Sequence, residues 1–517
     1  MSNVSAEGRS KNRQLTLNMV STLVSYALTL GISFFLTPFI VRKLGTDAYG
    51  FIGLSNTIIG YTGLLTVALN SMSLRFVTLN FHSGDFNRAN NYLASTFFGN
   101  CGLALFIVLT LGIVTLFLDR FISIPAHLVM DVKFLFTLMF VNSAISLVTG
   151  ILGFATFIKN RLELSNVRSI GQNVLRAVLT IVAYGFFPAH LWYIGAIAFI
   201  CTIYIVSVNY GYYRRLTPEL RVKKSAFSFG SMWEMTKSGA WNLLSSLSTI
   251  LNQGLDLLLA NVFISAYYMG ILSLSKSIPW ILIGIYATMS NVFQPEFIKL
   301  YAEKDMDQLR HTLVKSVRII GLFASFPCAI LFAYGDVFYS CWLNGADYME
   351  IYRASSITMV SLAVAMPTQA LWYIFTFTNK VRQSSLNLIK YGVINIILVV
   401  TAMFILDNDV QKLYSIVIIQ SVLMTIRYIT FLPFYGAKVL GFPKYSLLNP
   451  LLRILVSTSF VTVVSFVYKY IFIHTYTWLS LIGGCIFTTV TGIAFNYFLV
   501  LSASDRVFVK EKILHIK

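Results

Sequence analysis

Long apolar segments alternate with short polar ones from one end of the 517-residue chain to the other. Each apolar segment has about twenty residues or more, the length of helix that crosses a hydrocarbon core of about 30 Å. The pattern predicts an all-α, polytopic membrane protein of about fourteen transmembrane helices. The expected spans are 15–40, 48–79, 93–118, 132–158, 169–187, 190–213, 238–263, 267–297, 313–335, 351–377, 385–405, 411–434, 450–473 and 475–502.

The composition indicates that most of the chain is solvated by lipid. It is 57% hydrophobic and only 11% charged, with a mean hydropathy of +0.74, whereas a soluble protein is roughly 25% charged. The formal net charge of +19 comes mainly from loops on the N-terminal side of the predicted spans. The positive-inside rule therefore places both termini in the cytoplasm. Loop charges of this kind face anionic lipid headgroups, so we expect no nucleic-acid binding.

One stretch of sequence recurs later in the chain. "AYGFIGLSNTI" (48–58) resembles "YMGILSLSKSI" (268–278), and "LNMVSTL" (17–23) resembles "WNLLSSL" (241–247). The alternative is chance similarity between apolar helices, but the shared Gly and Ser positions favour a six-helix direct repeat, which predicts two lobes. The expected divisions are an N-terminal lobe 1–213, a basic cytoplasmic linker or interfacial helix 214–237, a C-terminal lobe 238–446, two additional helices 447–502 and a cytoplasmic tail 503–517.

The two copies share small residues that let helices approach closely. These are Gly50, Gly53 and Ser55 in the first copy and Gly270, Ser273 and Ser275 in the second. The copies differ where Asn56 is replaced by Lys276. This difference suggests that a cavity between the repeats has become electropositive.

Ionisable groups inside spans are costly and are presumed functional unless they reach the headgroups. Arg176, Asp256 and Lys276 are expected near mid-membrane, and Arg176 is the strongest candidate for binding an anion. Asp256 and Lys276 would form either a structural ion pair or a charge pair facing an aqueous cavity. Arg75 is added as a fourth candidate substrate-binding residue. The candidate polar cavity residues are Asn56, Asn252 and Gln253.

Other cations in spans are expected to extend their side chains to the cytoplasmic headgroups. Arg75 belongs to this group as well, and the other members are Lys315, Arg318, Lys390, Arg427 and Arg453.

The sequence offers no chemistry that would make it an enzyme. It contains no GxxxxGK[ST], HExxH, CxxC or GxSxG motif, and its five scattered Cys are expected to be inert buried thiols. No metal site or cofactor is expected. A membrane-embedded glycosyltransferase or polysaccharide polymerase is the enzyme alternative, but the outer loops are short for holding a sugar acceptor.

The junction "VRKLGTDAYGFIGL" (41–54) carries a family resemblance. Together with the span count and the repeat, it resembles the polysaccharide repeat-unit (Wzx-type) flippases of the multidrug/oligosaccharidyl-lipid/polysaccharide exporter superfamily. The matching residues are Arg42, Leu44, Gly45, Tyr49 and Gly50, with Asp256 ahead of a turn where Met269 departs from the usual Tyr.

The resemblance implies a bacterial cytoplasmic-membrane flippase. Its cargo would be an undecaprenyl-diphosphate-linked oligosaccharide for capsule, O-antigen, exopolysaccharide or teichoic acid. Its partners would be membrane lipids, with a polysaccharide polymerase and chain-length machinery as possible protein partners.

The residues agree with an anionic cargo, because two mid-membrane cations stand against one acid. A multidrug or metabolite exporter of the same superfamily is the transporter alternative and would favour an acidic cavity.

Alternating access by rocking of the two halves is expected. The sequence identifies neither the ion that drives transport nor the glycan that is carried. Candidate helix bends are Pro38, Pro279, Pro295, Pro327 and Pro367.

Overall fold

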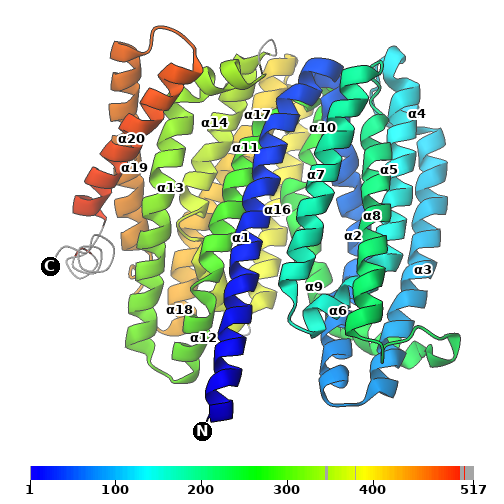
Figure 1. Cartoon of the computed structure of the whole chain (residues 1–517). Coiled ribbons are helices and arrows are strands. Elements are labelled where there is room, and N and C mark those ends of the chain that lie inside the picture. Colours follow the sequence, from blue (N-terminus) through cyan, green and yellow to red (C-terminus); the bar gives the residue numbers. More distant parts are fainter. Residues whose placement is uncertain (1, 344–346, 379, 501–505, 507–517) are drawn as a thin grey trace. The chain divides into compact units, whose positions relative to one another are not determined.

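The computed structural model describes residues 2–343, 347–378, 380–500 and 506. Within these ranges, the side chains of residues 2–13, 15, 16, 19, 23, 65, 241, 245, 252 and 253 are not described. The described residues form helices joined by turns and loops, with no strand among them (Figure 1). Its elements are α1 (Ser2–Leu44), α2 (Thr46–His82), α3 (Phe86–Leu116), α4 (Leu118–Phe121), η1 (Ala126–Leu128), α5 (Val129–Thr149), η2 (Gly150–Gly153), α6 (Phe154–Ile158), α7 (Leu162–Phe186), α8 (Tyr193–Leu216), η3 (Lys224–Ala226), α9 (Phe229–Gln253), α10 (Asp256–Phe263), α11 (Ala266–Asn291), α12 (Gln294–Ala302), α13 (Met306–Leu343), α14 (Tyr348–Ala365), η4 (Gln369–Trp372), α15 (Tyr373–Phe377), α16 (Val381–Ile405), α17 (Asp409–Thr430), η5 (Phe431–Tyr435), α18 (Gly436–Leu440), α19 (Leu448–Phe472) and α20 (Trp478–Leu499).

The prediction of an all-α membrane protein is confirmed. Eleven helices in the described residues are long and apolar enough to cross a membrane, or up to 13 if each of two bent pairs counts as one span. The one expected span that is missing from these 13 is 169–187, which corresponds to α7. This helix has 25 residues, enough to cross the hydrocarbon core, but it carries Arg168 and Arg176 and is not among the 13.

Several spans are interrupted, and proline explains some of the interruptions. The span formed by α14, η4 and α15 bends by 60°, and Pro367 lies in the break, where it has no N–H for the helical ladder. Helix α17 passes into the π-helical turn η5, which contains Pro433. By contrast, three of the prolines proposed as bends lie inside the continuous helices α1, α11 and α13: Pro38, Pro279 and Pro327.

The chain divides into two compact units, Met1–Gly270 and Ile271–Lys517. In unit 1, α2 packs against α3 and α9, α1 packs against α7, and α5 lies between α3 and α8. In unit 2, α13 packs against α14, α19 and α20, and α17 packs against α14 and α16. The lobe boundaries expected from the repeat stay predictions.

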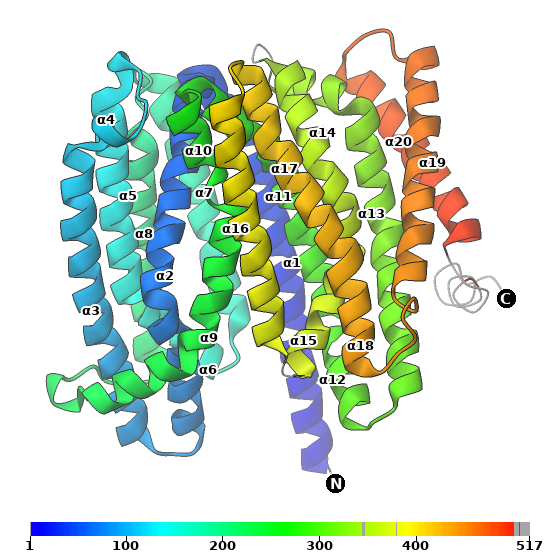
Figure 2. The same ribbon diagram turned by 180° about the vertical axis from the view of Figure 1, so that it is seen from behind.

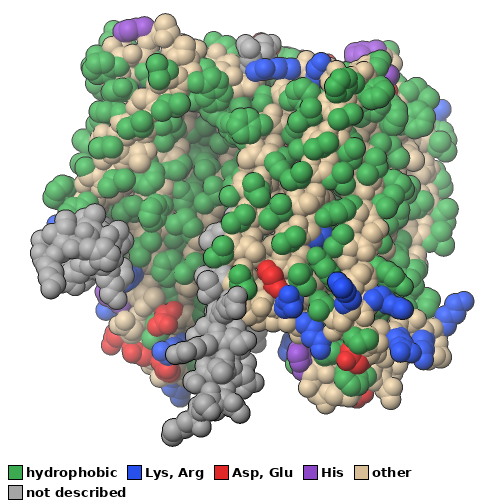
Figure 3. Space-filling view, viewed as in Figure 1, with side chains coloured by type: hydrophobic (Ala, Val, Ile, Leu, Met, Phe, Trp, Pro, Cys, Tyr) green, Lys and Arg blue, Asp and Glu red, His purple; other side chains and the backbone are tan. Residues whose placement is uncertain are grey.

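Basic side chains gather at one end of unit 1. Figure 3 shows Lys and Arg side chains gathered at the lower end of this unit, where α8 ends and the turn into α7 lies, while hydrophobic side chains cover the middle. Arg214 and Arg215 close the last turn of α8. The first turns of α9 lie across this end (Figure 2), with Phe229 and Trp233 exposed. The expected interfacial helix is thus the beginning of α9, and its location at a membrane surface stays a prediction.

The small-residue motif of the repeat lies at a close backbone approach inside unit 1. A Cβ built on Gly50 of α2 would lie 2.8 Å from the backbone nitrogen of Gly270, at the start of α11. A Cβ on Gly270 would lie 2.2 Å from the backbone oxygen of Thr46. Because no Cβ tolerates such distances, glycine is required at both positions for the two repeat copies to make this contact.

Replacing Gly270 with Ala is therefore expected to lower the thermal unfolding midpoint of the purified protein by several degrees. The obstruction is a backbone carbonyl, so relief requires the helices to separate, a form of overpacking that typically costs about 1–3 kcal/mol. Gly63→Ala is the matched control, because a Cβ at Gly63 meets nothing within 4 Å. Equal midpoints for the two variants would contradict the packing argument.

In unit 2, the last two helices are attached to α13 by buried polar groups. Asn496 of α20 donates to Ser325 of α13 at 2.6 Å and accepts from Ser457 of α19 at 2.6 Å. Nearer the other end of α13, Lys469 of α19 donates to both carboxylate oxygens of Asp336 at 2.6 Å. The additional helices are therefore fixed to the unit by specific contacts at two levels, as well as by apolar packing.

Candidate functional site

A polar seam runs between α1 and α7 in unit 1. Asn18 caps the start of α7 by accepting from the backbone N–H of Glu163 at 3.1 Å. Further along the seam, Asn166 donates to Thr22 at 2.9 Å and Asn173 donates to Thr29 at 2.8 Å. The polar residues on α1 recur at intervals of four and seven residues, so they share one helix face. The α1–α7 seam comprises Asn18, Thr22, Thr29 and Ser33 on α1, and Asn166, Asn173 and Arg176 on α7.

Arg176 continues this seam along α7. It lies roughly 15 Å from the Phe186 end of the helix at 1.5 Å per residue, and its Nη2 donates to the Ser33 hydroxyl at 3.4 Å. Its buried Nε has no hydrogen-bond partner among the described residues. Arg168, two turns earlier, instead faces α8 and donates to Asn209 at 2.5 Å. The buried Nε of Arg168 likewise has no hydrogen-bond partner among the described residues, so what distinguishes Arg176 is its contact with Ser33 on α1.

Lys276 lies on α11 in unit 2 and is 8% exposed. Its Nζ donates to the side-chain oxygen of Gln420 on α17 at 3.4 Å. At 1.5 Å per residue, Lys276 is roughly 15 Å from the start of α11. The lysine that replaces Asn56 in the repeat is therefore held inside the unit by a partner that the sequence did not indicate.

Arg427 of α17 corrects an expectation from the sequence. We expected this side chain to reach the headgroups, but it is 1% exposed. The reason is the length of the span, which continues through η5 and α18 to Leu440 and so places Arg427 roughly 20 Å from that end. The residue is a buried cation inside unit 2, and Gln420 precedes it by seven residues on the same face of α17.

Aromatic rings and one amide surround Arg427. Its Cζ lies 4.5 Å from the ring centroid of Trp372 and 5.8 Å from that of Phe431, distances at which the ring faces attract a cation. Its Nε donates to Asn387 of α16 at 3.1 Å, and its buried Nη2 has no partner in the described part of the chain. Trp372 belongs to the broken α14–α15 span, and Phe431 to the π-helical turn, a feature frequent at functional sites.

The remaining candidates lie as follows. Asp256 is buried at the first residue of α10. Two residues earlier, the carbonyl of Gly254 accepts a hydrogen bond from the Tyr61 hydroxyl. Asn56 and Arg75 are exposed on α2. The side chains of two further candidates lie outside the described residues: Asn252 and Gln253.

Asp256 and Lys276 belong to different units, so their proposed pairing stays a prediction. The structure brings Arg176 together with Ser33, and Lys276 together with Gln420. Each unit therefore has a cation with a polar neighbour inside a helix long enough to span the membrane. Guanidinium and ammonium groups placed in this way can bind phosphate.

The similarities to known proteins fit this architecture. No family model matches the chain. It is 25% identical over 500 residues to the uncharacterized membrane protein EpsK of Bacillus subtilis (strain 168), covering 96% of this chain and 98% of that one.

Two solved structures share the fold at low sequence identity. One is the lipid II flippase MurJ in an inward closed conformation, with 12% identity, a TM-score of 0.67, and coverage of 96% of this chain and 100% of that chain. The other is an inward-facing multidrug resistance MATE family transporter of the MOP superfamily, with 13% identity, a TM-score of 0.66, and coverage of 83% and 97%. The chain has the fold that this flippase and this transporter share.

Proposed function

We propose that the chain is a flippase that moves an undecaprenyl-diphosphate-linked oligosaccharide repeat unit across the bacterial cytoplasmic membrane, for capsule, O-antigen or exopolysaccharide synthesis. The observation that carries this proposal is Arg176. It is a guanidinium midway along a helix of membrane-spanning length, and its buried Nε has no partner in the described residues. A cation inside a membrane is expensive to keep, so its retention indicates an anionic ligand.

The other features of the two units suit the same cargo. A diphosphate cannot cross hydrocarbon unaided, and the guanidinium of Arg176 and the ammonium of Lys276 would lower the barrier by binding it. The α1–α7 seam offers hydroxyl and amide groups of the kind that sugars bind through hydrogen bonds. The lipid tail would remain in the bilayer while the two halves alternate between inward- and outward-open states.

The fold relatives support a lipid-linked substrate in general terms, because one of them is a flippase for lipid II. The cytoplasmic placement of both termini belongs to the proposal and rests on the basic loops. Association with a polysaccharide polymerase and chain-length machinery is likewise proposed. Multidrug export is the second candidate, favoured by the similarity to the MATE transporter and by the buried acid Asp256.

Arg176→Ala is expected to abolish surface polysaccharide in a strain whose own copy of the gene is deleted, while the protein inserts at normal levels. Lys276→Ala should have the same effect. Arg176→Lys should restore activity only partly, because an ammonium cannot bind phosphate through two parallel hydrogen bonds. Transport is measured directly as the movement of a diphosphate-linked oligosaccharide across proteoliposomes.

The matched control is Arg161→Ala. Arg161 directly precedes the same helix and is exposed, so its loss should leave transport unchanged. Normal transport by both Arg176→Ala and Lys276→Ala would refute the proposed site. Export of cationic drugs without movement of the lipid-linked sugar would favour the second candidate.

A further inference from the structure

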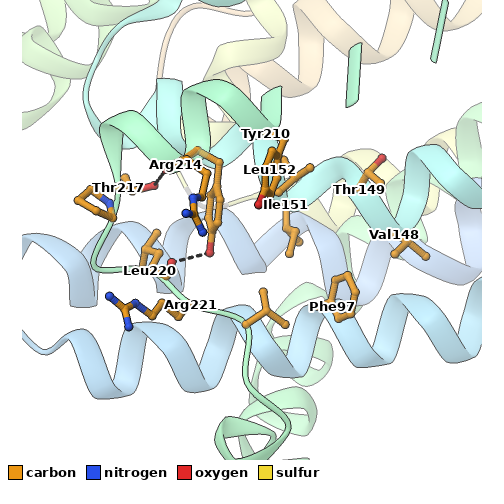
Figure 4. A pocket seen from close by; sticks show the side chains of 13 residues that line it. Phe97, Val148, Thr149, Ile151, Leu152, Tyr210, Arg214, Thr217, Leu220 and Arg221 are labelled. Atoms are coloured by element: carbon orange, nitrogen blue, oxygen red, sulfur yellow. Dashed lines mark hydrogen bonds between the residues drawn. The ribbon is translucent and has the colours of Figure 1, made fainter. Parts of the chain in front are cut away.

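Unit 1 contains a pocket of about 670 Å³ at its basic end. Its walls come from α3, from α8, from the junction of α5 with η2, and from the 217–222 loop (Figure 4). This pocket includes none of the residues proposed above to bind the transported cargo. It uses instead the basic loop that follows α8, for which the proposed function gives no role.

The pocket has one basic end and one apolar end. Figure 4 shows Arg214 and Arg221 at the end that the loop closes, and Phe97 and Val148 at the opposite end. None of the 13 lining residues is acidic. Leu152 and Ile151 extend the apolar wall. A ligand that fills this space would need an anionic group at one end and a hydrocarbon portion at the other.

The basic end is built on a fixed turn. Tyr213 is buried and donates through its hydroxyl to the carbonyl of Leu220 at 2.7 Å. Asn90 of α3 accepts from the backbone N–H of Arg221 at 2.8 Å and donates to the carbonyl of Glu219 at 3.2 Å. These bonds hold the backbone that carries Arg221 without using its guanidinium. The site is therefore organised before a ligand arrives.

Both guanidinium groups are available. Arg214 and Arg221 are exposed; the Cζ of Arg214 lies 6.0 Å from the ring centroid of Tyr210, and neither group has an ion pair in the described residues. Guanidinium groups bind phosphate through paired hydrogen bonds, and basic pockets between membrane helices bind anionic headgroups. Phe97 and Val148 lie within segments long enough to span the membrane, where an acyl chain would already be.

We propose that this pocket binds an anionic phospholipid, with its phosphate at Arg214 and Arg221 and the beginning of an acyl chain against Phe97 and Val148. The shared chemistry is that of a phosphate ester, which a soluble phosphate could also provide. The apolar end of the pocket favours the lipid. Binding would tie α3 and α8 together through the loop and stabilise unit 1.

The test uses the purified full-length protein in neutral detergent. Phosphatidylglycerol is titrated while bound lipid is followed by native mass spectrometry and the unfolding midpoint by a thermal assay. We expect saturable binding of one lipid and a higher midpoint, with phosphatidylcholine having no effect. Arg214→Gln combined with Arg221→Gln should weaken binding by about 30-fold, as expected for the loss of two Arg contacts with an anionic lipid.

The control is Arg215→Gln combined with Lys223→Gln, which removes the same charge from the same segment at exposed residues that do not line the pocket. An equal loss of binding in this control would overturn the site in favour of general surface attraction. Glycerol phosphate and inorganic phosphate form a second arm, and an equal midpoint shift from either would overturn the lipid assignment. The two single Gln variants give the same readout if the double variant fails to fold.

Discussion

Replacing Lys469 with Met is expected to destabilise the protein by roughly 3–5 kcal/mol, because it leaves the carboxylate of Asp336 buried without its cation. The Asp336 side chain is 7% exposed and lies 2.6 Å from the ammonium of Lys469. The Tyr476 hydroxyl donates to the same carboxylate at 2.6 Å. Burial, together with this hydrogen bond, raises the pKa of Tyr476, so the phenol stays protonated as a donor. One neutral donor cannot replace the lost cation. Thermal unfolding in detergent measures the effect.

A double variant distinguishes two causes of the lost stability: an unpaired buried charge, or the loss of side-chain contacts. Asp336→Leu combined with Lys469→Met removes both charges and should recover most of the lost stability. Lys133→Met is the control, since its partner Asp119 is 45% exposed, and we expect no measurable change in the midpoint. If Lys469→Met unfolded at the same temperature as the wild type, the bridge would have no role in holding α19 to α13.

Replacing Arg427 with Met is expected to reduce transport by about tenfold or more while leaving the unfolding midpoint unchanged or higher. A buried guanidinium with an unused Nη2 is unfavourable for folding, and an apolar side chain of similar length can fill its space. Its retention in a membrane span therefore indicates a role in function. Arg427 lies between the broken α14–α15 span and the π-helical turn after α17, so it links two interrupted segments of unit 2.

Two comparisons test this assignment. Arg427→Lys keeps the charge but loses the guanidinium that lies over the ring of Trp372, so transport should recover only in part. Arg453→Met removes an exposed cation of α19 in the same unit and should leave transport intact. A large drop in the midpoint of Arg427→Met, with normal transport per folded molecule, would show that the residue is structural.

The sequence by itself determined the class of the protein and the position of nearly every span. Each apolar run is a local signal, because its length alone decides whether a helix can cross the bilayer. Local patterns also pointed to Gly50 and Gly270, where the structure has a close backbone approach. Arg176 was identified from its expected depth near mid-membrane, and the structure leaves its Nε without a hydrogen-bond partner in the described residues.

The tertiary structure decided what surrounds the polar groups. Lys469 and Asp336 are 133 residues apart, and Arg427 contacts Trp372 from another span. Hydropathy misjudged Arg427 because it ended the span at residue 434, while the helix continues through a π-helical turn to Leu440. The pocket with Arg214 and Arg221 likewise needs three helices and a loop. Crossing a membrane depends on hydrophobicity summed along one segment, whereas satisfying a buried charge depends on partners that only packing brings within reach.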